Sequence, residues 1–156
     1  MSLRILHWAA VCPACIQSFL IDNDKPYDTQ REMIARAQAE GLCGSKDAPT
    51  DYVLDHNVDK FCALHEIECR KLEDRKIPSE IPKGEGILLG CWNYGNAAQS
   101  HCVRFSEYIS AEKFQVMNPA LLSDADTFPE MTIGRIEQWG CDVWKIHLKD
   151  SPKPEK

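Results

Sequence analysis

The chain has 156 residues, 44% of them hydrophobic and 27% charged, which suffices for a folded domain with an apolar core. Its net charge of −6 argues against nucleic-acid binding, which needs a basic surface. Runs of about 18 or more apolar residues are absent, so the sequence predicts no membrane-spanning helix. We expect one domain over residues 1–150 and a disordered tail over 151–156. We expect a cytoplasmic protein, or one exported without a cleaved signal peptide.

The first half of the chain has the patterns of three helices. The first opens at Cys12 and carries Pro13 in its first turn, where a missing N–H costs nothing. A capping pattern over residues 28–32 starts the second helix, which stops at Gly41. Residues 57–66 form the third, with apolar residues at helical spacing along one face.

The second half is typical of an antiparallel sheet. Strands are predicted over residues 69–72, 86–92, 103–108, 113–117 and 141–148, and the third and fourth form a hairpin. A turn is expected over residues 93–96, and a short helix over 131–139 that ends at Gly140. Helices first and an antiparallel sheet second define an α+β fold.

Eight cysteines are spread along the chain. An even number is compatible with disulfides in an exported protein. The chain is long enough to fold without them, and its N-terminal segment lacks the features of an export signal. The sequence therefore favours buried free thiols in a reducing compartment.

Three residues follow one another in an order that suits nucleophilic catalysis. Cys12 lies at a predicted helix start, where free N–H groups and the helix dipole favour the thiolate. His101 opens a strand-like run, and Asn118 ends the next strand before Pro119. A thiol, a base and an amide that orients the base are the parts of a cysteine nucleophile site. Taken singly, each residue also fits a structural role, as a buried thiol, a core histidine and a turn.

This pattern resembles the papain-like cysteine peptidase superfamily, and most of all its small bacterial branch, the bacteriocin-leader peptidase domains. In that branch a Cys begins the first helix, a His opens a strand, and Asp-Pro or Asn-Pro ends the next strand. The resemblance implies a papain-like fold, with N-terminal helices packed on a C-terminal twisted antiparallel sheet. It also implies Cys12 as nucleophile, His101 as base and Asn118 as the orienting residue.

The same resemblance implies an activity. The expected reaction is hydrolysis or acyl transfer at an amide of a protein or peptide substrate, by a peptidase or a glutamine deamidase. Neither a metal nor an organic cofactor is required, and neither nucleic acid nor membrane is an expected partner. Small members of the superfamily are often secreted effectors, so a bacterial effector is one expectation.

The chain departs from the family pattern around the nucleophile. Val11-Cys12-Pro13 stands where the branch has Asp-Cys-Gly. If Cys15 is matched to the second cysteine of the family motif, Cys12 lies one residue out of step, and Cys15 becomes a second nucleophile candidate. The oxyanion glutamine is also absent, because position 6 is Leu. His7 is the nearest polar substitute.

Two other interpretations of the cysteines remain open. The segment from Trp8 to Cys15 resembles the thioredoxin motif, in which Cys12 would attack and Cys15 would resolve a mixed disulfide. Alternatively, Cys12 and Cys15 together with residues of the 62–69 segment could bind zinc. That segment offers three ligands, Cys62, His65 and Cys69.

Overall fold

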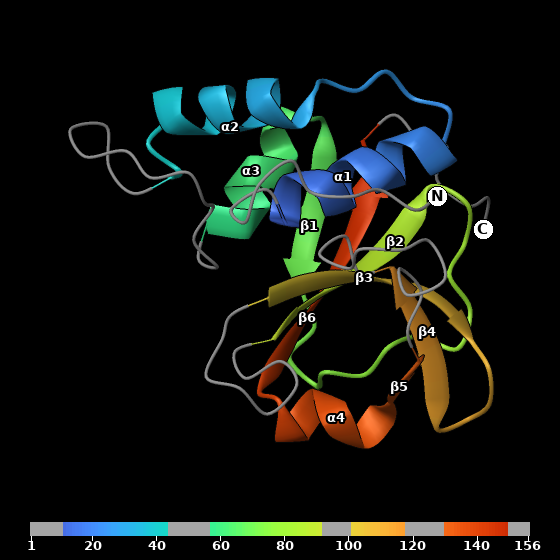
Figure 1. Cartoon of the computed structure of the whole chain (residues 1–156). Helices are drawn as coiled ribbons and strands as arrows, with labels where there is room; N and C mark the ends of the chain where they lie inside the picture. Colours follow the sequence, from blue (N-terminus) through green and yellow to red (C-terminus); the bar gives the residue numbers. More distant parts are fainter. Residues whose placement is uncertain (1–10, 44–56, 92–100, 118–129, 150–156) are drawn as a thin grey trace.

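The computed structural model describes residues 11–43, 57–91, 101–117 and 130–149 (Figure 1). Helices and strands follow one another in the order α1 (Val11–Asp22), α2 (Gln30–Ala39), α3 (Val58–Leu64), β1 (Ile67–Lys71), β2 (Glu85–Cys91), β3 (His101–Tyr108), β4 (Lys113–Met117), β5 (Glu130–Thr132), α4 (Ile133–Gln138) and β6 (Cys141–Leu148). This is the α+β order that the sequence predicts.

The strands form one sheet in the order β1-β6-β2-β3-β4-β5. Each strand pairing in the described part of the chain is antiparallel. Strands β2 to β5 are neighbours in chain order, whereas β6 returns to lie between β1 and β2. The first and last of these strands in the chain, β1 and β6, are therefore neighbours in the sheet.

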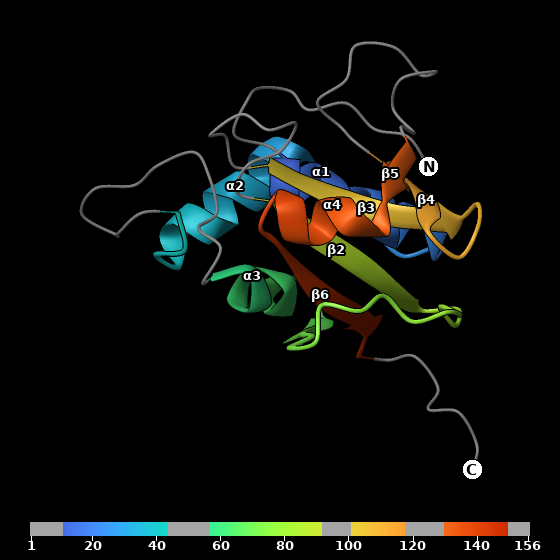
Figure 2. The ribbon, with the colours of Figure 1, turned by 90° about the horizontal axis from the view of Figure 1, so that it is seen from below.

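Each face of the sheet is covered by helices (Figures 1 and 2). On one face, α1, α2 and α3 pack against Leu88, Trp144 and Ile146. On the other face, α4 packs with Ile87 and Leu89 in a second core cluster. Successive residues of β2 thus alternate between the two clusters, as side chains of a strand do. We call these the α1 face and the α4 face.

Most of the elements predicted from the sequence are confirmed. The capping pattern before α2 is present, since the Thr29 side chain accepts from the Glu32 N–H and the Glu32 carboxylate accepts from the Thr29 N–H. The predicted hairpin is the pair β3–β4. One prediction is wrong: residues 131 and 132 belong to β5 and not to a helix, because this segment pairs with β4 before α4 begins.

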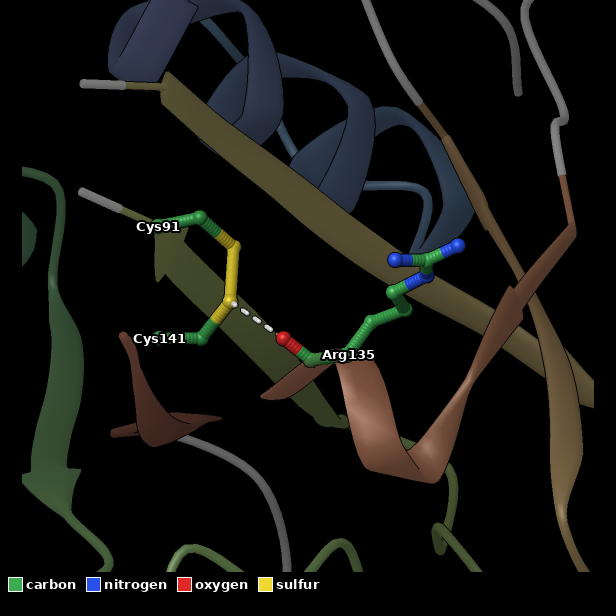
Figure 3. The surroundings of a disulfide bond; sticks show 3 residues. All are labelled: Cys91, Arg135 and Cys141. Carbon is green, nitrogen blue, oxygen red and sulfur yellow. Dashed lines mark hydrogen bonds between the residues drawn. A yellow bond between two sulfur atoms is a disulfide. The ribbon is translucent and has the colours of Figure 1, made fainter. Parts of the chain in front are cut away.

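The prediction that the cysteines are free is wrong for one pair. Cys91 and Cys141 face each other across β2 and β6 and form a disulfide (Figure 3). The carbonyl oxygen of Arg135 in α4 lies 4.0 Å from the Cys141 sulfur. The other six cysteines are free thiols. All six belong to or pack against the core of the α1 face, whereas the disulfide lies in the core of the α4 face.

Several predictions fall on residues outside those described. They are the lead-in to α1 with His7, the turn over residues 93–96, Asn118, and the tail over residues 151–156. None of the helices in the described ranges is long and apolar enough to cross a membrane.

Candidate active site

Helix α1 lies on β3 and is fixed there by Arg104. The Nη1 atom of Arg104 donates to the Ser18 hydroxyl at 2.8 Å and to Asp22 Oδ2 at 2.6 Å. Its guanidinium also lies 5.5 Å from the centre of the Phe19 ring. These contacts involve the second half of α1, so the first turn of the helix, with Cys12, is directed to the beginning of β3.

Three thiols meet where α1 crosses the beginning of β3. Cys12 and Cys15 are one helical turn apart on α1, and Cys102, the second residue of β3, is the neighbour with the largest effect on the pKa of each. The Cys15 thiol also lies 3.7 Å from the Cys102 carbonyl oxygen, to which it donates. Cys12 is 8% exposed and Cys15 is fully buried, whereas Cys102 is partly exposed. We call this group the three-thiol cluster.

The three thiols of the cluster have shifted pKa values, and the shifts differ in direction. The hydrogen bond to Cys102, and then burial, raise the pKa of the Cys12 thiol well above its usual range. The same two causes raise the pKa of Cys15. In contrast, the hydrogen bonds from Cys12 and Cys15 hold the pKa of Cys102 well below its usual range, and nearby His101 acts in the same direction. Of the three thiols, Cys102 is therefore the one that ionises most readily.

The expectation that the helix start makes Cys12 the thiolate is wrong for this arrangement. A helix N-terminus stabilises a nearby charge by about 0.3–1 kcal/mol when exposed. Burial of a thiolate opposes ionisation and shifts a pKa by up to several units. Because Cys12 is buried and donates its hydrogen bond, it is held as a neutral thiol.

His101 begins β3 and is partly exposed. In the strand register it lies opposite Cys91, and Cys102 lies opposite Gly90. Directly paired residues of neighbouring strands share a face of the sheet. His101 is thus assigned to the α4 face with the disulfide, and Cys102 to the α1 face with Cys12. The structure brings His101 to the same strand end as Cys12, but on the opposite face of the sheet.

The α1 face beside Cys102 is closed by an indole ring. A methyl group added to Gly90 would lie 2.5 Å from a ring carbon of Trp144, so the ring covers this glycine closely. Gly90 is the register partner of Cys102. Trp144 is 6% exposed, and it belongs to the same core cluster as Cys12 and Cys15. An apolar wall therefore borders the three-thiol cluster.

Sequence reasoning proposed Cys12, Cys15 and His101 as site residues and did not consider Cys102, which the structure places beside Cys15. A signal was present, because consecutive strand residues point to opposite faces and only one of His101 and Cys102 can face α1. Val103 and Phe105 belong to the second cluster, which assigns Cys102 and Arg104 to the helix side. His7 and Asn118 lie outside the described residues, so their roles stay predictions.

The two alternative interpretations of the cysteines fit this fold poorly. A thioredoxin arrangement needs parallel strands joined through helices, whereas the strand pairs described are antiparallel. For zinc, the described ranges contain no group of three or more Cys, His, Asp or Glu side chains arranged to hold a metal ion. Cys62 instead hydrogen-bonds to Cys69, which with burial raises the pKa of Cys62.

The overall structure resembles peptidase domains of bacterial transporters. The peptidase domain of Streptococcus ComA, a bi-functional ABC transporter involved in a quorum-sensing pathway, superposes with a TM-score of 0.62 at 8% identity, over 94% of this chain and 96% of that one. A double-glycine-motif protease from an AMS/PCAT transporter, solved with its leader peptide, gives 0.57 at 15% identity, over 93% and 90%. The peptidase domain of Streptococcus mutans ComA gives 0.50 at 9% identity, over 92% and 97%.

These similarities confirm the papain-like fold that the sequence resemblance implied. They cover nearly the whole of each chain, so the likeness extends to the helices and the sheet together. At such low identities the likeness concerns the fold. No protein-family model and no curated protein matches the sequence itself.

Proposed function

We propose that this protein is a cysteine-dependent hydrolase that cleaves peptide bonds, with Cys12 as its nucleophile. The observation that carries the proposal is the placement of Cys12 in the first turn of α1, against the beginning of β3, in a fold shared with cysteine peptidase domains. One of these domains was solved with a leader peptide, which supports a peptide as the class of substrate.

In the proposed reaction, His101 takes the proton of the Cys12 thiol, and the thiolate attacks the carbonyl carbon of the substrate. His101 then gives that proton to the leaving amine, and water hydrolyses the acyl-enzyme. Asn118 accepts from the second imidazole N–H and fixes its orientation. The backbone N–H of Cys12, with His7, stabilises the oxyanion. These assignments follow the order of the residues in the chain.

The described arrangement corresponds to a resting state in this scheme. Cys12 donates to Cys102 and is neutral, and His101 is assigned to the other face of the sheet. The proposed reaction requires the His101 side chain, at the first residue of its strand, to reach the α1 face around the strand end. We expect a bound peptide to displace Cys102 as the partner of Cys12 and to bring the imidazole to the thiol.

The experiment incubates the protein with a proteome-derived peptide library and identifies new termini by mass spectrometry. We expect cleavage by the wild type, and a loss of about 10³-fold or more in Cys12→Ser. His101→Ala and Asn118→Ala should also reduce the rate. Gly134→Ala in α4 is the control, since an added methyl group there meets nothing within 4 Å, and it should leave the rate unchanged.

Other results would reassign the site. Cleavage that survives in Cys12→Ser but is lost in Cys15→Ser would make Cys15 the nucleophile. Conversion of glutamine to glutamate without new termini would indicate a deamidase. Retention of peptides without any reaction would leave a binding module with this fold and no catalysis.

The disulfide bears on where the protein works. Disulfides persist in oxidising compartments and are rare in the reducing cytosol. The Cys91–Cys141 bond therefore supports export over a cytoplasmic location. Tagged protein should then be found in the culture medium, and its free-thiol count there should show this pair oxidised.

A further inference from the structure

We propose that a cavity at the end of α1 farthest from Cys12 binds a free α-amino acid with an apolar side chain. The cavity has a volume of about 380 Å³, which is within the range of small-molecule sites. Its walls come from α1, α2, the end of β6, and the two segments that join α1 to α2 and α3 to β1. Leu20, one of its lining residues, lies about 12 Å from Cys12 along the helix axis. The cavity is therefore distinct from the candidate active site, and the inference does not depend on the proposed function.

One part of the cavity is apolar. Leu20 of α1 and Leu148 of β6 are 4% and 5% exposed, and Leu64 ends α3 and packs on the core of the α1 face. These three side chains come from separate elements and line one space, so they can enclose an aliphatic or aromatic side chain. The transfer of such a group from water to this surface favours binding.

A fixed guanidinium borders the same space. Arg36 of α2 donates from Nη1 to Asp28 Oδ2 at 3.0 Å and from Nη2 to the Leu64 carbonyl oxygen at 2.7 Å. Both partners also line the cavity, so the charged group is held at its wall. Each Nη atom carries a second N–H, and the Arg36 side chain is half-exposed with these two bonds made. A ligand carboxylate can therefore accept from a donor that is already oriented.

A residue in an unusual backbone conformation places a carboxylate at the cavity. Glu66, between α3 and β1, has a φ of 58°, in the left-handed region that residues other than glycine seldom adopt. Its backbone is fixed on both sides, because its N–H donates to the Ala63 carbonyl oxygen at 3.2 Å and its carbonyl oxygen accepts from the Lys149 N–H at 3.1 Å. The side chain is exposed and lines the cavity. Strained residues of this kind cluster at ligand sites, and a carboxylate is a partner for a ligand ammonium.

The charges around the cavity balance. Lys25 and Arg36 are cations, and Asp28 and Glu66 are anions. His65, which also lines the cavity, is neutral at pH 7, because burial and then Arg36 lower its pKa to about 4. A ligand with a single charge, such as a phosphate or a simple amine, would meet as many like charges as opposite ones. A zwitterion matches a wall of this composition, and an α-amino acid carries its two charges beside its side chain.

The arrangement requires both ends of the ligand to be free. The ligand carboxylate binds Arg36, the ammonium binds Glu66, and the side chain lies against the three leucines. A residue within a peptide carries neither charge, and a terminal residue carries only one of them. The ligand class is therefore the free amino acid.

The test titrates the full chain with L-leucine, and it follows the heat of binding by calorimetry and the backbone amide shifts by NMR. We expect saturable binding with a Kd of about 1 mM or tighter, and shifts that gather around Arg36 and Glu66. L-leucine amide keeps only the ammonium, and N-acetyl-L-leucine keeps only the carboxylate. Each should bind at least about tenfold more weakly than L-leucine.

Two variants assign the ends of the ligand. Glu66→Gln should weaken L-leucine by about tenfold and leave N-acetyl-L-leucine unchanged, because the acetylated ligand has no ammonium. Arg36→Gln should weaken L-leucine and leave L-leucine amide unchanged, and that unchanged binding also shows that the cavity is intact. Glu73→Gln is the matched control, since this exposed glutamate lies outside the cavity lining, and it should bind as the wild type does.

The inference is overturned if L-leucine does not saturate the protein by about 10 mM, or if Glu66→Gln binds it as tightly as the wild type. Equal binding of N-acetyl-L-leucine would indicate a site for the carboxyl end of a peptide instead. Shifts confined to the neighbours of Cys12 would place the ligand in the candidate active site. None of these measurements depends on peptide cleavage, so the proposed function stands or fails separately.

Discussion

Replacement of Arg104 by methionine should loosen the contact between α1 and the sheet. The Arg104 side chain is 15% exposed and that of its partner Asp22 is 32% exposed, so solvent screens this pair only in part. A hydrogen bond to a charged group contributes about 1.5–3 kcal/mol, the bond to Ser18 about 1, and the cation–π contact with Phe19 about 0.5–1. Methionine keeps most of the apolar stem.

One term acts in the opposite direction. The Nε of Arg104 is buried and has no hydrogen-bond partner among the described residues, and its removal recovers about 1 kcal/mol. The net expected loss in the free energy of unfolding is therefore about 2–4 kcal/mol. Urea denaturation at pH 7 measures it, and a double-mutant cycle with Asp22→Asn should give a coupling of about 1–2 kcal/mol.

The Arg104→Met variant also tests how accessible Cys12 becomes when α1 is less firmly held. If Arg104 holds α1 on β3, its loss should expose the first turn of the helix, and alkylation of Cys12 should become faster. Arg104→Lys is the matched control, because it keeps the charge beside Asp22 and should lose less stability. A methionine variant within about 0.5 kcal/mol of wild type, with unchanged alkylation of Cys12, would refute this account of how α1 is held.

Three further changes test other parts of the fold. Replacing Cys91 and Cys141 together by alanine opens a loop with a sequence separation of 50, and should lower the free energy of unfolding in guanidinium by about 4 kcal/mol. Burial, and then Arg36, lower the pKa of His65 from 6.5 to about 4. The unfolded chain therefore binds a proton at a higher pH than the folded chain does, and the free energy of unfolding should fall as the pH is lowered from 6.5 to about 4. This loss, about 1–2 kcal/mol after screening, should be absent in His65→Gln when both proteins are titrated. Gly90→Ala should lower the melting temperature, because the added methyl carbon would lie 2.5 Å from a ring carbon of Trp144 and the clash should cost about 1–3 kcal/mol of stability. Gly134→Ala should not lower it, because a methyl group there meets nothing within 4 Å.

Local patterns in the sequence predicted the elements well because the signals are local. The capping box at the start of α2 depends on residues three apart, and the structure contains both of its hydrogen bonds. The alternation over residues 141–148 gave β6 its bounds. The three residues of β5 carry too short a pattern to be identified. They are a strand because β4 lies beside them, which is a tertiary fact.

The disulfide escaped prediction for the same reason. Eight cysteines allow many pairings, and nothing within either strand marks Cys91 as the partner of Cys141. The two meet because β6 returns between β1 and β2, and the register then places them directly opposite. The sequence alone could weigh an oxidising against a reducing compartment, but it could not supply the register of β2 and β6.

The sequence predicted which residues could form the candidate site, but not which face of the sheet each residue of β3 would occupy. We expected Cys12 to lie near the start of the strand that carries His101, and it does. The register with β2, however, places Cys102 and not His101 on the α1 face. A helix start alone predicted an ionised Cys12, and this failed because burial and a hydrogen bond outweigh the dipole of one helical turn. Two adjacent residues of β3, His101 and Cys102, therefore have different relations to Cys12. Burial and Cys102 raise the pKa of Cys12 on the α1 face, and in the proposed reaction His101 must reach Cys12 past the strand end. It follows that any change which removes Cys102 from Cys12, whether a bound peptide or the substitution Cys102→Ser, should lower the pH at which Cys12 is alkylated, provided that His101 is present.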